Sequence, residues 1–196
     1  AGYDILIGAG LLGQTGKLIA ERFAPSRVAI ITDSTVDKLY AHRLLSSLQE
    51  AGLFSCKYVF PAGERSKNLG VYGEILEFLA SHELDRSSLI IALGGGVAGD
   101  MAGFAAATYM RGIPYVQIPT TLLAAIDSSV GGKTAVDLQS GKNLAGAFHQ
   151  PSLVLCDTDA LETLPAQIFA DGAAEAIKYG VLDSRALFSQ LCSGKI

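Results

Sequence analysis

The stretch LIIALGGGVAGD, residues 89–100, gives the strongest indication of the fold. Its first five residues are all apolar, as is typical of a central strand in a parallel sheet. Three glycines, 94–96, follow, and there backbone N–H groups can approach an anion without obstruction by a Cβ atom. A helical pattern begins directly afterwards, so its positive dipole end would face the same point. The stretch predicts a strand, a phosphate-binding turn and a helix; glycines that serve packing alone are the alternative.

The same alternation of short β-rich stretches and longer helical patterns runs through most of the chain. The other β-rich stretches lie at 3–7, 27–32, 54–60, 114–118 and 152–156. Helical patterns lie at 34–52, 68–84 and 97–110, and for the first of them we expect Ser34 as N-cap and Gly52 as C-cap. The fold class predicted is α/β: a Rossmann-like, doubly wound, mostly parallel sheet with helices on both faces.

The pattern changes near Leu164, after which only helices are predicted, over 166–182 and 183–191. We therefore expect an α/β domain over 1–164 and the beginning of an all-α C-terminal domain, incomplete, over 165–196. The alternative is a terminal helix pair that packs back on the sheet.

Composition narrows the functional class. The chain has 196 residues, 49% of them apolar, and a net charge of −4 with no basic run, which argues against a nucleic-acid surface. The stretch between Arg86 and Arg111 contains Asp100 and five glycines, so a buried strand and helix explain it better than a membrane span. Three widely spaced cysteines and no visible signal peptide favour a cytoplasmic location.

Two further glycine motifs were considered as phosphate sites. Residues 8–13 form a G-x-G-x-x-G after a short strand, and Asp33 follows twenty residues after Gly13, as in a dinucleotide-binding fingerprint. A tight turn without a ligand is an equal alternative for this motif. The tripeptide GKT at 132–134 does not complete a P-loop, because the required glycine five residues before Gly132 is Asp127.

Five motifs, read in order, carry a resemblance to a known family. They are PAGERSK (61–67), GGGVAGDMAGFAAATYMRG (94–112), IPTTLLAAIDSSVGGKTAVD (118–137), GKNLAGAFHQP (141–151) and ADGAAEAIKYG (170–180). With these motifs the chain resembles the 3-dehydroquinate synthase family. Members of that family are roughly twice as long, so the resemblance implies an N-terminal domain plus the start of a C-terminal helical domain.

The resemblance implies conversion of the seven-carbon sugar acid phosphate DAHP to 3-dehydroquinate and phosphate, in the shikimate pathway of aromatic biosynthesis. The cofactors implied are NAD and a divalent metal, zinc or cobalt. A ring hydroxyl is oxidised transiently by NAD+, phosphate is eliminated, the hydride returns, and the opened ring closes again by an aldol step. A homodimer is implied too, in which Arg111 reaches the substrate phosphate of the neighbouring subunit; otherwise Arg111 is a cation at a helix C-terminus.

The resemblance also assigns cofactor contacts. It places the NAD pyrophosphate on Gly95, Gly96 and Val97, with Asp100 near the nicotinamide and Asp33 on the adenosine ribose. Residues 8–13 then form only a turn. The further cofactor contacts implied are Glu64, Lys67, Thr120, Thr121, Lys142 and Thr163. Without the resemblance, these side chains are interpreted as a surface ion pair, helix caps and loop residues.

Four residues are implied to bind substrate: Asp127, Lys133, Asn143 and Lys178. Lysines balance the anionic groups of the substrate, whereas Asp and Asn hydrogen-bond hydroxyls. Glu175, on one helix face with Asp171 and Lys178, is implied to be a metal ligand. The other two family ligands are histidines expected beyond Ile196, so we expect this chain alone neither to hold zinc tightly nor to turn over.

Two alternatives to the synthase remain open. A related sugar-phosphate cyclase or a metal-dependent polyol dehydrogenase would share the architecture, but a dehydrogenase would release NADH. A stand-alone NAD-binding module is the alternative from another class. The intact substrate set argues against this last alternative, because a sensor of the cofactor has no use for Asp127, Lys133, Asn143 and Lys178.

Overall fold

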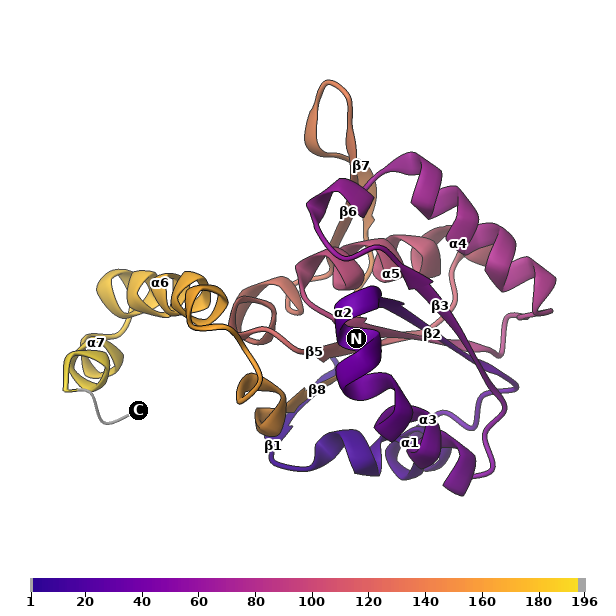
Figure 1. The fold of residues 1–196 in the computed structure, drawn as a ribbon, viewed down its shortest axis with the longest axis horizontal. Coiled ribbons are helices and arrows are strands. Elements are labelled where there is room, and N and C mark those ends of the chain that lie inside the picture. The colour runs from indigo at the N-terminus through magenta and orange to yellow at the C-terminus, as the bar shows by residue number, and fades with distance from the viewer. Residues whose placement is uncertain (1, 194–196) are drawn as a thin grey trace.

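A six-stranded sheet forms the centre of the structure, a computed structural model that describes residues 2–193. Its strand order is β1-β8-β5-β4-β2-β3, and every neighbouring pair is parallel (Figure 1). The strands are β1 (Asp4–Gly8), β2 (Val28–Asp33), β3 (Ser55–Phe60), β4 (Leu89–Gly94), β5 (Tyr115–Pro119) and β8 (Leu153–Asp157). All six predicted strands are present, and the predicted α/β class is confirmed.

Helices cover both faces of this sheet (Figure 1). Helices α1 (Leu11–Arg22) and α3 (His42–Glu50) pack on one face, and α4 (Leu69–Ser81) and α5 (Gly96–Thr108) on the other. The short helix α2 (Ser34–Val36) and the π-helical turn η1 (Asp37–Ala41) lead directly into α3. The sheet is therefore doubly wound, as the alternating pattern predicted.

Burial on both faces explains the unbroken apolar runs of the central strands. In β2, Ile30 faces the core under α1 and α3, and its neighbour Ile31 faces the core under α4 and α5. Successive side chains of a strand point to opposite faces, so a strand covered on both sides needs apolar residues at every position. Helix α5 is rich in Ala and Gly, so it can lie close to the segments that surround it. At Gly103, for example, a Cβ atom would lie only 2.5 Å from the Thr134 side chain.

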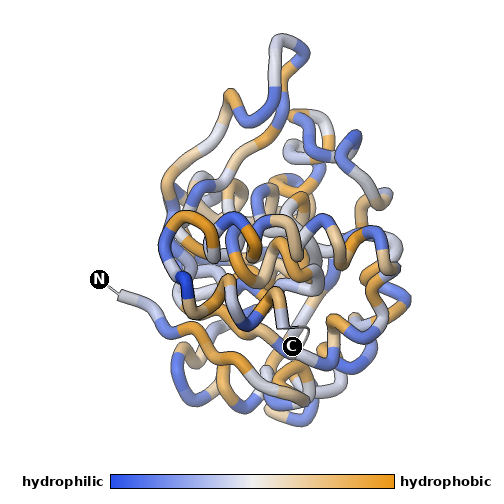
Figure 2. Tube along the Cα trace, turned by 90° about the vertical axis from the view of Figure 1, so that its left-hand side faces the viewer, coloured by the Kyte–Doolittle hydropathy of each residue, from blue (hydrophilic) through white to orange (hydrophobic). Residues whose placement is uncertain are grey.

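An antiparallel hairpin, which the sequence did not predict, follows β5. It consists of β6 (Lys133–Leu138) and β7 (Gly141–Phe148) and packs against α5. Its tip projects beyond the rest of the molecule, as two perpendicular views show (Figures 1 and 2). The hairpin carries two of the predicted substrate residues, Lys133 on β6 and Asn143 on β7.

The chain after β8 is helical, as predicted for the described residues. Helices α6 (Ala166–Leu182) and α7 (Arg185–Cys192) lie beside the sheet rather than over it (Figure 1). Short turns η2 (Glu64–Ser66), η3 (Tyr109–Arg111), η4 (Ala124–Ser128) and η5 (Thr158–Leu161) complete the secondary structure. The domain boundary at 164 stays a prediction, and the last three residues of the second predicted domain lie outside those described. No described helix is long and apolar enough to cross a membrane.

The predicted capping of the helix after β2 was wrong by one residue at each end. Asp33, not Ser34, is the N-cap: its Oδ1 accepts hydrogen bonds from the backbone N–H of Thr35 and Val36, at 2.8 and 3.0 Å. A carboxylate caps a helix as well as a hydroxyl does, and it also favours the positive dipole end. The C-cap is Ala51, and Gly52 follows it in the left-handed conformation that terminates helices.

Candidate functional site

The glycine loop after β4 has the geometry of an open anion site. Gly94 has a φ of +153°, and a Cβ there would lie 2.8 Å from Cβ of Ala98, so the turn requires glycine. Gly95 is the N-cap of α5 and offers no side chain to its first turn. Within residues 2–193, no side chain accepts a hydrogen bond from the N–H groups of residues 96–98. The first turn of α5 is thus free to bind an anionic group.

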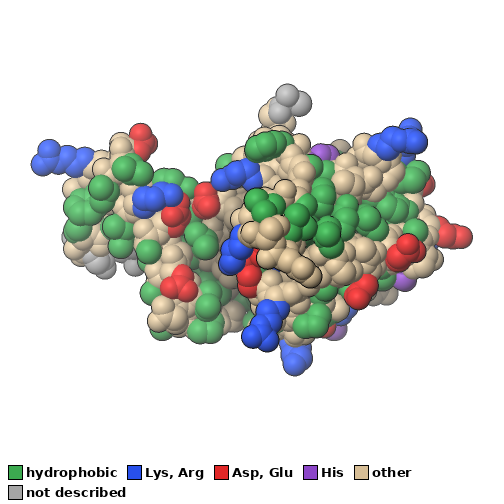
Figure 3. Space-filling model, turned by 90° about the horizontal axis from the view of Figure 1, so that it is seen from above, with side chains coloured by type: hydrophobic (Ala, Val, Ile, Leu, Met, Phe, Trp, Pro, Cys, Tyr) green, Lys and Arg blue, Asp and Glu red, His purple; other side chains and the backbone are tan. Residues whose placement is uncertain are grey.

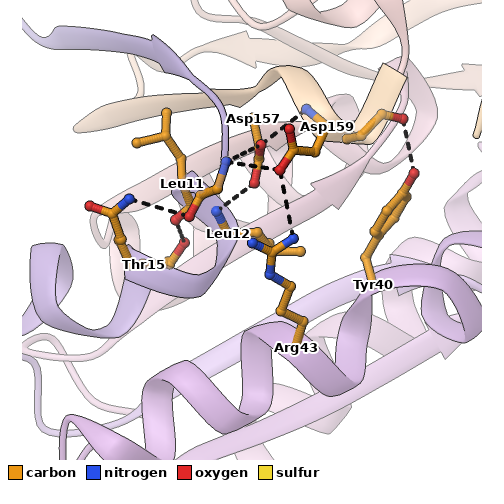
Figure 4. A network of polar contacts seen from close by, with 10 residues as sticks. Leu11, Leu12, Thr15, Tyr40, Arg43, Asp157 and Asp159 are labelled. Carbon is orange, nitrogen blue, oxygen red and sulfur yellow. Dashed lines mark hydrogen bonds and ion pairs between the residues drawn. The ribbon is translucent and has the colours of Figure 1, made fainter. Parts of the chain in front are cut away.

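The rival loop between β1 and α1 already holds an anion of the protein itself (Figure 4). Asp157 accepts hydrogen bonds from the N–H of Gly10 at 2.9 Å and from that of Leu12 at 2.8 Å. Asp159 also accepts a hydrogen bond from the N–H of Gly10, at 3.0 Å, so two carboxylates share this donor, and Arg43 lies 4.0 Å from Asp159. These carboxylates occupy the position that a pyrophosphate would take in a dinucleotide fingerprint. Of the two alternatives for residues 8–13, the geometry therefore favours the turn.

Gly13, the last glycine of that motif, and Gly16, which follows it in α1, contact helix α3 instead. The Ser47 hydroxyl on α3 donates to the carbonyl of Gly13 at 2.8 Å and accepts from the N–H of Gly16 at 2.9 Å. A Cβ at Gly16 would lie 1.9 Å from the carbonyl oxygen of Ser47. Glycine is needed here because α1 and α3 touch backbone to backbone.

Three predicted cofactor residues meet at the carboxyl ends of β2, β4 and β5. Asp33 ends β2, and its Oδ2 lies 3.6 Å from where a Cβ of Gly94 would be. Thr120 follows β5, and its hydroxyl is buried without a hydrogen-bond partner in the described part of the chain. Thr121 packs against Gly95. Because ligands of open α/β sheets sit beyond the carboxyl ends of strands, this is the expected place for a nucleotide.

Lys67 connects the cofactor residues to the substrate residues. Its ammonium is buried, with 6% of the side chain exposed, and lies 2.5 Å from Oδ2 of Asp100. It also donates to Oδ1 of Asn143 at 2.5 Å. Burial raises the pKa of Asp100, and the hydrogen bond from Lys67 opposes that shift. Nearby, Lys142 and Glu64 form an exposed ion pair at 2.8 Å.

A cavity of about 500 Å³ opens between α5, η4 and the hairpin. It is lined by Asp100, Asp127, Ser128, Lys133, Thr134, Ala135, Asn143, Leu144, Gly146, Ala147 and Phe148. Three of the four predicted substrate residues therefore share one cavity with Asp100. Viewed from above, acidic and basic side chains lie near one another where the α6–α7 part meets the sheet domain (Figure 3).

Helix α6 carries the fourth predicted substrate residue and the predicted metal ligand, and it touches this site through a residue that was not predicted. Glu175 and Lys178 form an ion pair on α6. Tyr179 donates a hydrogen bond to Oδ1 of Asp127 at 3.0 Å. That bond, more than burial, raises the pKa of Tyr179 to about 12.

Glu175 alone does not make a metal site. Catalytic zinc usually has three protein ligands, and residues 2–193 contain no group of three His, Cys, Asp or Glu side chains placed to hold a metal. Its role as a ligand stays a prediction.

Two predicted residues lie apart from this cluster. Arg111 is exposed at the far end of α5, about 20 Å from the glycine loop at 1.5 Å per helical residue. Met110 and Arg111 both have left-handed φ angles, of +52° and +68°. The hydroxyl groups of Thr163 and Tyr40 are hydrogen-bonded to each other, and the Tyr40 hydroxyl also donates to the carbonyl of Ala160 at 2.9 Å. Thr163 thus ties the β8–α6 connection to the helical segment after β2.

Comparison with known proteins supports the resemblance. The family model for the N-terminal part of 3-dehydroquinate synthase matches residues 57–171, more than half of the chain. The 3-dehydroquinate synthase of Pelobacter propionicus is 52% identical over 189 residues, which are 96% of this chain and 53% of that protein. That of Symbiobacterium thermophilum is 50% identical over 181 residues, 92% of this chain and 51% of that protein. The chain thus spans about half the length of these relatives.

Solved structures share the fold. A 2-epi-5-epi-valiolone synthase from Streptomyces hygroscopicus, with NAD+ and Zn2+ bound, is 33% identical with a TM-score of 0.89, covering 100% of this chain and 54% of that one. A 2-deoxy-scyllo-inosose synthase complexed with carbaglucose-6-phosphate, NAD+ and Co2+ is 32% identical with a TM-score of 0.84, covering 90% and 47%. On the match to the family model and the relatives, this chain belongs to the 3-dehydroquinate synthase family.

Proposed function

We propose that the protein containing this sequence converts DAHP to 3-dehydroquinate and phosphate, with NAD+ and a divalent metal, zinc or cobalt. One structural observation supports this proposal in addition to the family match. A polar cavity containing Asp100, Asp127, Lys133 and Asn143 lies beside an open glycine loop at the start of α5. A phosphorylated, polyhydroxylated substrate and a dinucleotide could therefore bind side by side.

The described residues fit NAD. The free N–H groups of the first α5 turn would bind the pyrophosphate, and the Thr120 hydroxyl, buried without a partner, would gain one from the cofactor. Asp33 would accept hydrogen bonds from the ribose hydroxyls through Oδ2, and its charge disfavours the 2′-phosphate of NADP. When bound, NAD+ supplies transient oxidation by accepting a hydride and returning it.

The chain's own side chains would bind and orient the substrate. Lys133 and Lys178 provide positive charge for phosphate and carboxylate groups. Asp127 and Asn143 can hydrogen-bond ring hydroxyls and so select their configuration. Lys67, with its Nζ between Asp100 and Asn143, would hold these two cavity residues in place. Glu175 would contribute one metal ligand; the described residues do not complete such a site, and no step is assigned to a metal.

A homodimer with Arg111 acting across the interface is also part of the proposal. The exposed position of Arg111, beyond the end of α5 opposite the glycine loop, supports it, because a side chain there is accessible to a second subunit. Mixing Arg111→Ala and Lys133→Ala subunits tests the idea. Each variant alone should be inactive, whereas random mixed dimers should recover about a quarter of the activity, from one intact site per heterodimer. No recovery in demonstrably mixed dimers would contradict it.

The test of the reaction is phosphate release from DAHP by the full-length protein with NAD+ and zinc. We expect phosphate and 3-dehydroquinate in equal amounts and no net NADH, and we expect Lys133→Met to abolish release. NADH accumulation with an alcohol substrate would indicate a dehydrogenase. Turnover of another sugar phosphate only would indicate a related cyclase. NAD+ binding without turnover would favour a cofactor-binding module. A cytoplasmic location is proposed too, supported by free thiols at Cys56, Cys156 and Cys192.

A further inference from the structure

We infer that Tyr179 is a positioning residue of this site, whose hydroxyl holds the Asp127 carboxylate in the orientation that faces substrate. The inference rests on the proposed function, because the substrate role of Asp127 belongs to it. Neither the sequence motifs nor the family assignment singled out Tyr179.

The contact is a directed one. The Tyr179 hydroxyl lies 3.0 Å from Oδ1 of Asp127, and an ionised carboxylate only accepts hydrogen bonds, so the phenol is the donor. In the part of the chain that the structure describes, no other side chain donates to Asp127. One carboxylate oxygen is therefore fixed by Tyr179, and the second is left for a ligand in the cavity that Asp127 lines.

Helix α6 is docked so that Tyr179 reaches Asp127 from a fixed position. Gly172 lies two turns earlier on the same helix face, and a Cβ there would lie 2.7 Å from both the backbone nitrogen of Leu123 and Cβ of Leu122. The helix thus touches the backbone just before η4, the turn that carries Asp127. A close backbone contact and a hydrogen bond, seven residues apart, set both the distance and the rotation of α6.

Two charged groups of α6 lie near this contact, and the Glu175 carboxylate, after that of Asp127, also contributes to the raised pKa of Tyr179. Lys178 pairs with Glu175 on the same helix, and its Nζ lies 5.0 Å from the centre of the Tyr179 ring. Neither group is paired with Asp127. Without the phenol, Asp127 would lose the side-chain hydrogen-bond donor that it has among the described residues.

The consequence is measurable in Tyr179→Phe, which removes one hydroxyl and keeps the ring. Hydrogen bonds to charged groups correspond to roughly a 10- to 100-fold effect. We expect kcat/KM for DAHP to fall by about that factor, mainly through a higher KM, with the NAD+ dissociation constant unchanged within about twofold. A residue that only supports the fold would instead change NAD+ affinity and thermal stability together.

Tyr58→Phe is the matched control, because Tyr58 also donates to a carboxylate, that of Glu74 at 2.5 Å, but far from the site. It should leave both kinetic constants unchanged. A double-mutant cycle with Asp127→Asn gives the decisive readout: if Tyr179 acts through Asp127, adding Tyr179→Phe to Asp127→Asn should cost less than about threefold. Fully additive losses, or wild-type kinetics in Tyr179→Phe, would overturn the inference.

A second measurement separates this inference from the proposed function. The 13C chemical shift of the Asp127 carboxyl in the NAD+-bound protein should move in Tyr179→Phe and stay constant in Tyr58→Phe. Absence of DAHP turnover in wild type, together with this shift change, would refute the function and leave the contact standing. An unmoved shift would refute the positioning role whatever the substrate.

Discussion

Asp157 provides a direct test of the conclusion that the glycine motif at residues 8–13 forms a turn and not a phosphate site. The residue is 4% exposed and binds the N–H groups of Gly10 and Leu12, at 2.9 and 2.8 Å. In Asp157→Asn, the amide can accept only one of these bonds, and its NH2 group must face the other N–H. The substitution thus changes charge and donor pattern while it keeps the side-chain volume.

The expected magnitude follows from these two bonds. Each charge-assisted bond contributes about 1.5–3 kcal/mol, whereas a neutral replacement contributes about 0.5–1.5 kcal/mol. Losing one bond and weakening the other should lower the free energy of unfolding by about 2–4 kcal/mol. Asp159→Asn is the matched control, because Asp159 is 43% exposed and makes only one of the bonds to the loop; its loss should stay below about 1 kcal/mol.

Urea unfolding of the full-length protein measures both losses, and calorimetry measures NAD+ affinity in parallel. Because the pyrophosphate is assigned to the α5 loop, Asp157→Asn should bind NAD+ within about threefold of wild type once folded. If Asp157→Asn lowers the free energy of unfolding no more than Asp159→Asn does, Asp157 does not stabilise the Gly10 loop as proposed. If Asp157→Asn loses NAD+ affinity while the fold stays intact, the Gly10 loop takes part in NAD+ binding and the assignment of the pyrophosphate to the α5 loop is wrong.

Three further outcomes are expected. Asp33→Ser keeps a helix cap but removes the carboxylate, so NAD+ affinity measured by calorimetry should fall about tenfold or more; unchanged affinity would contradict the ribose assignment. Gly16→Ala should lower the free energy of unfolding by about 3 kcal/mol, because its Cβ would lie 1.9 Å from a backbone oxygen. Gly73→Ala, at a helical position with open space around it, should raise the free energy of unfolding by about 0.5–1 kcal/mol. Urea titrations measure both changes. Burial raises the pKa of Cys156 to about 11, so roughly a thousandth of this thiol is ionised at pH 8. Iodoacetamide should therefore label the exposed Cys192 first, and the slow labelling rate of Cys156 should rise tenfold per pH unit. Equal labelling rates of the two thiols would contradict this expectation.

The sheet could be predicted because burial on two faces leaves a plain signature. Strands such as β4 must be apolar at every position, and the glycine turn after it marks the start of a helix. The hairpin could not be predicted in the same way. Its strand β7 has mostly exposed side chains, so neither alternation nor an apolar run identifies it.

The site shows the same contrast. Residues inside the long motifs, such as Lys133 and Asn143, were predicted, and the structure brings them together around one cavity. Tyr179 and Asp157 were missed because their roles depend on partners 52 and 147 residues away in the chain. No local spacing encodes such a contact. Asp157 did carry one weak signal, since it directly follows a buried strand at the carboxyl edge of the sheet.

The structure of the protein with NAD+ bound tests the assignment of the two glycine loops most directly. We expect the pyrophosphate on the N–H groups of Gly95, Gly96 and Val97, a ribose on Asp33, and Asp157 still bonded to Gly10. A pyrophosphate on the Gly10 loop, with Asp157 displaced, would contradict it.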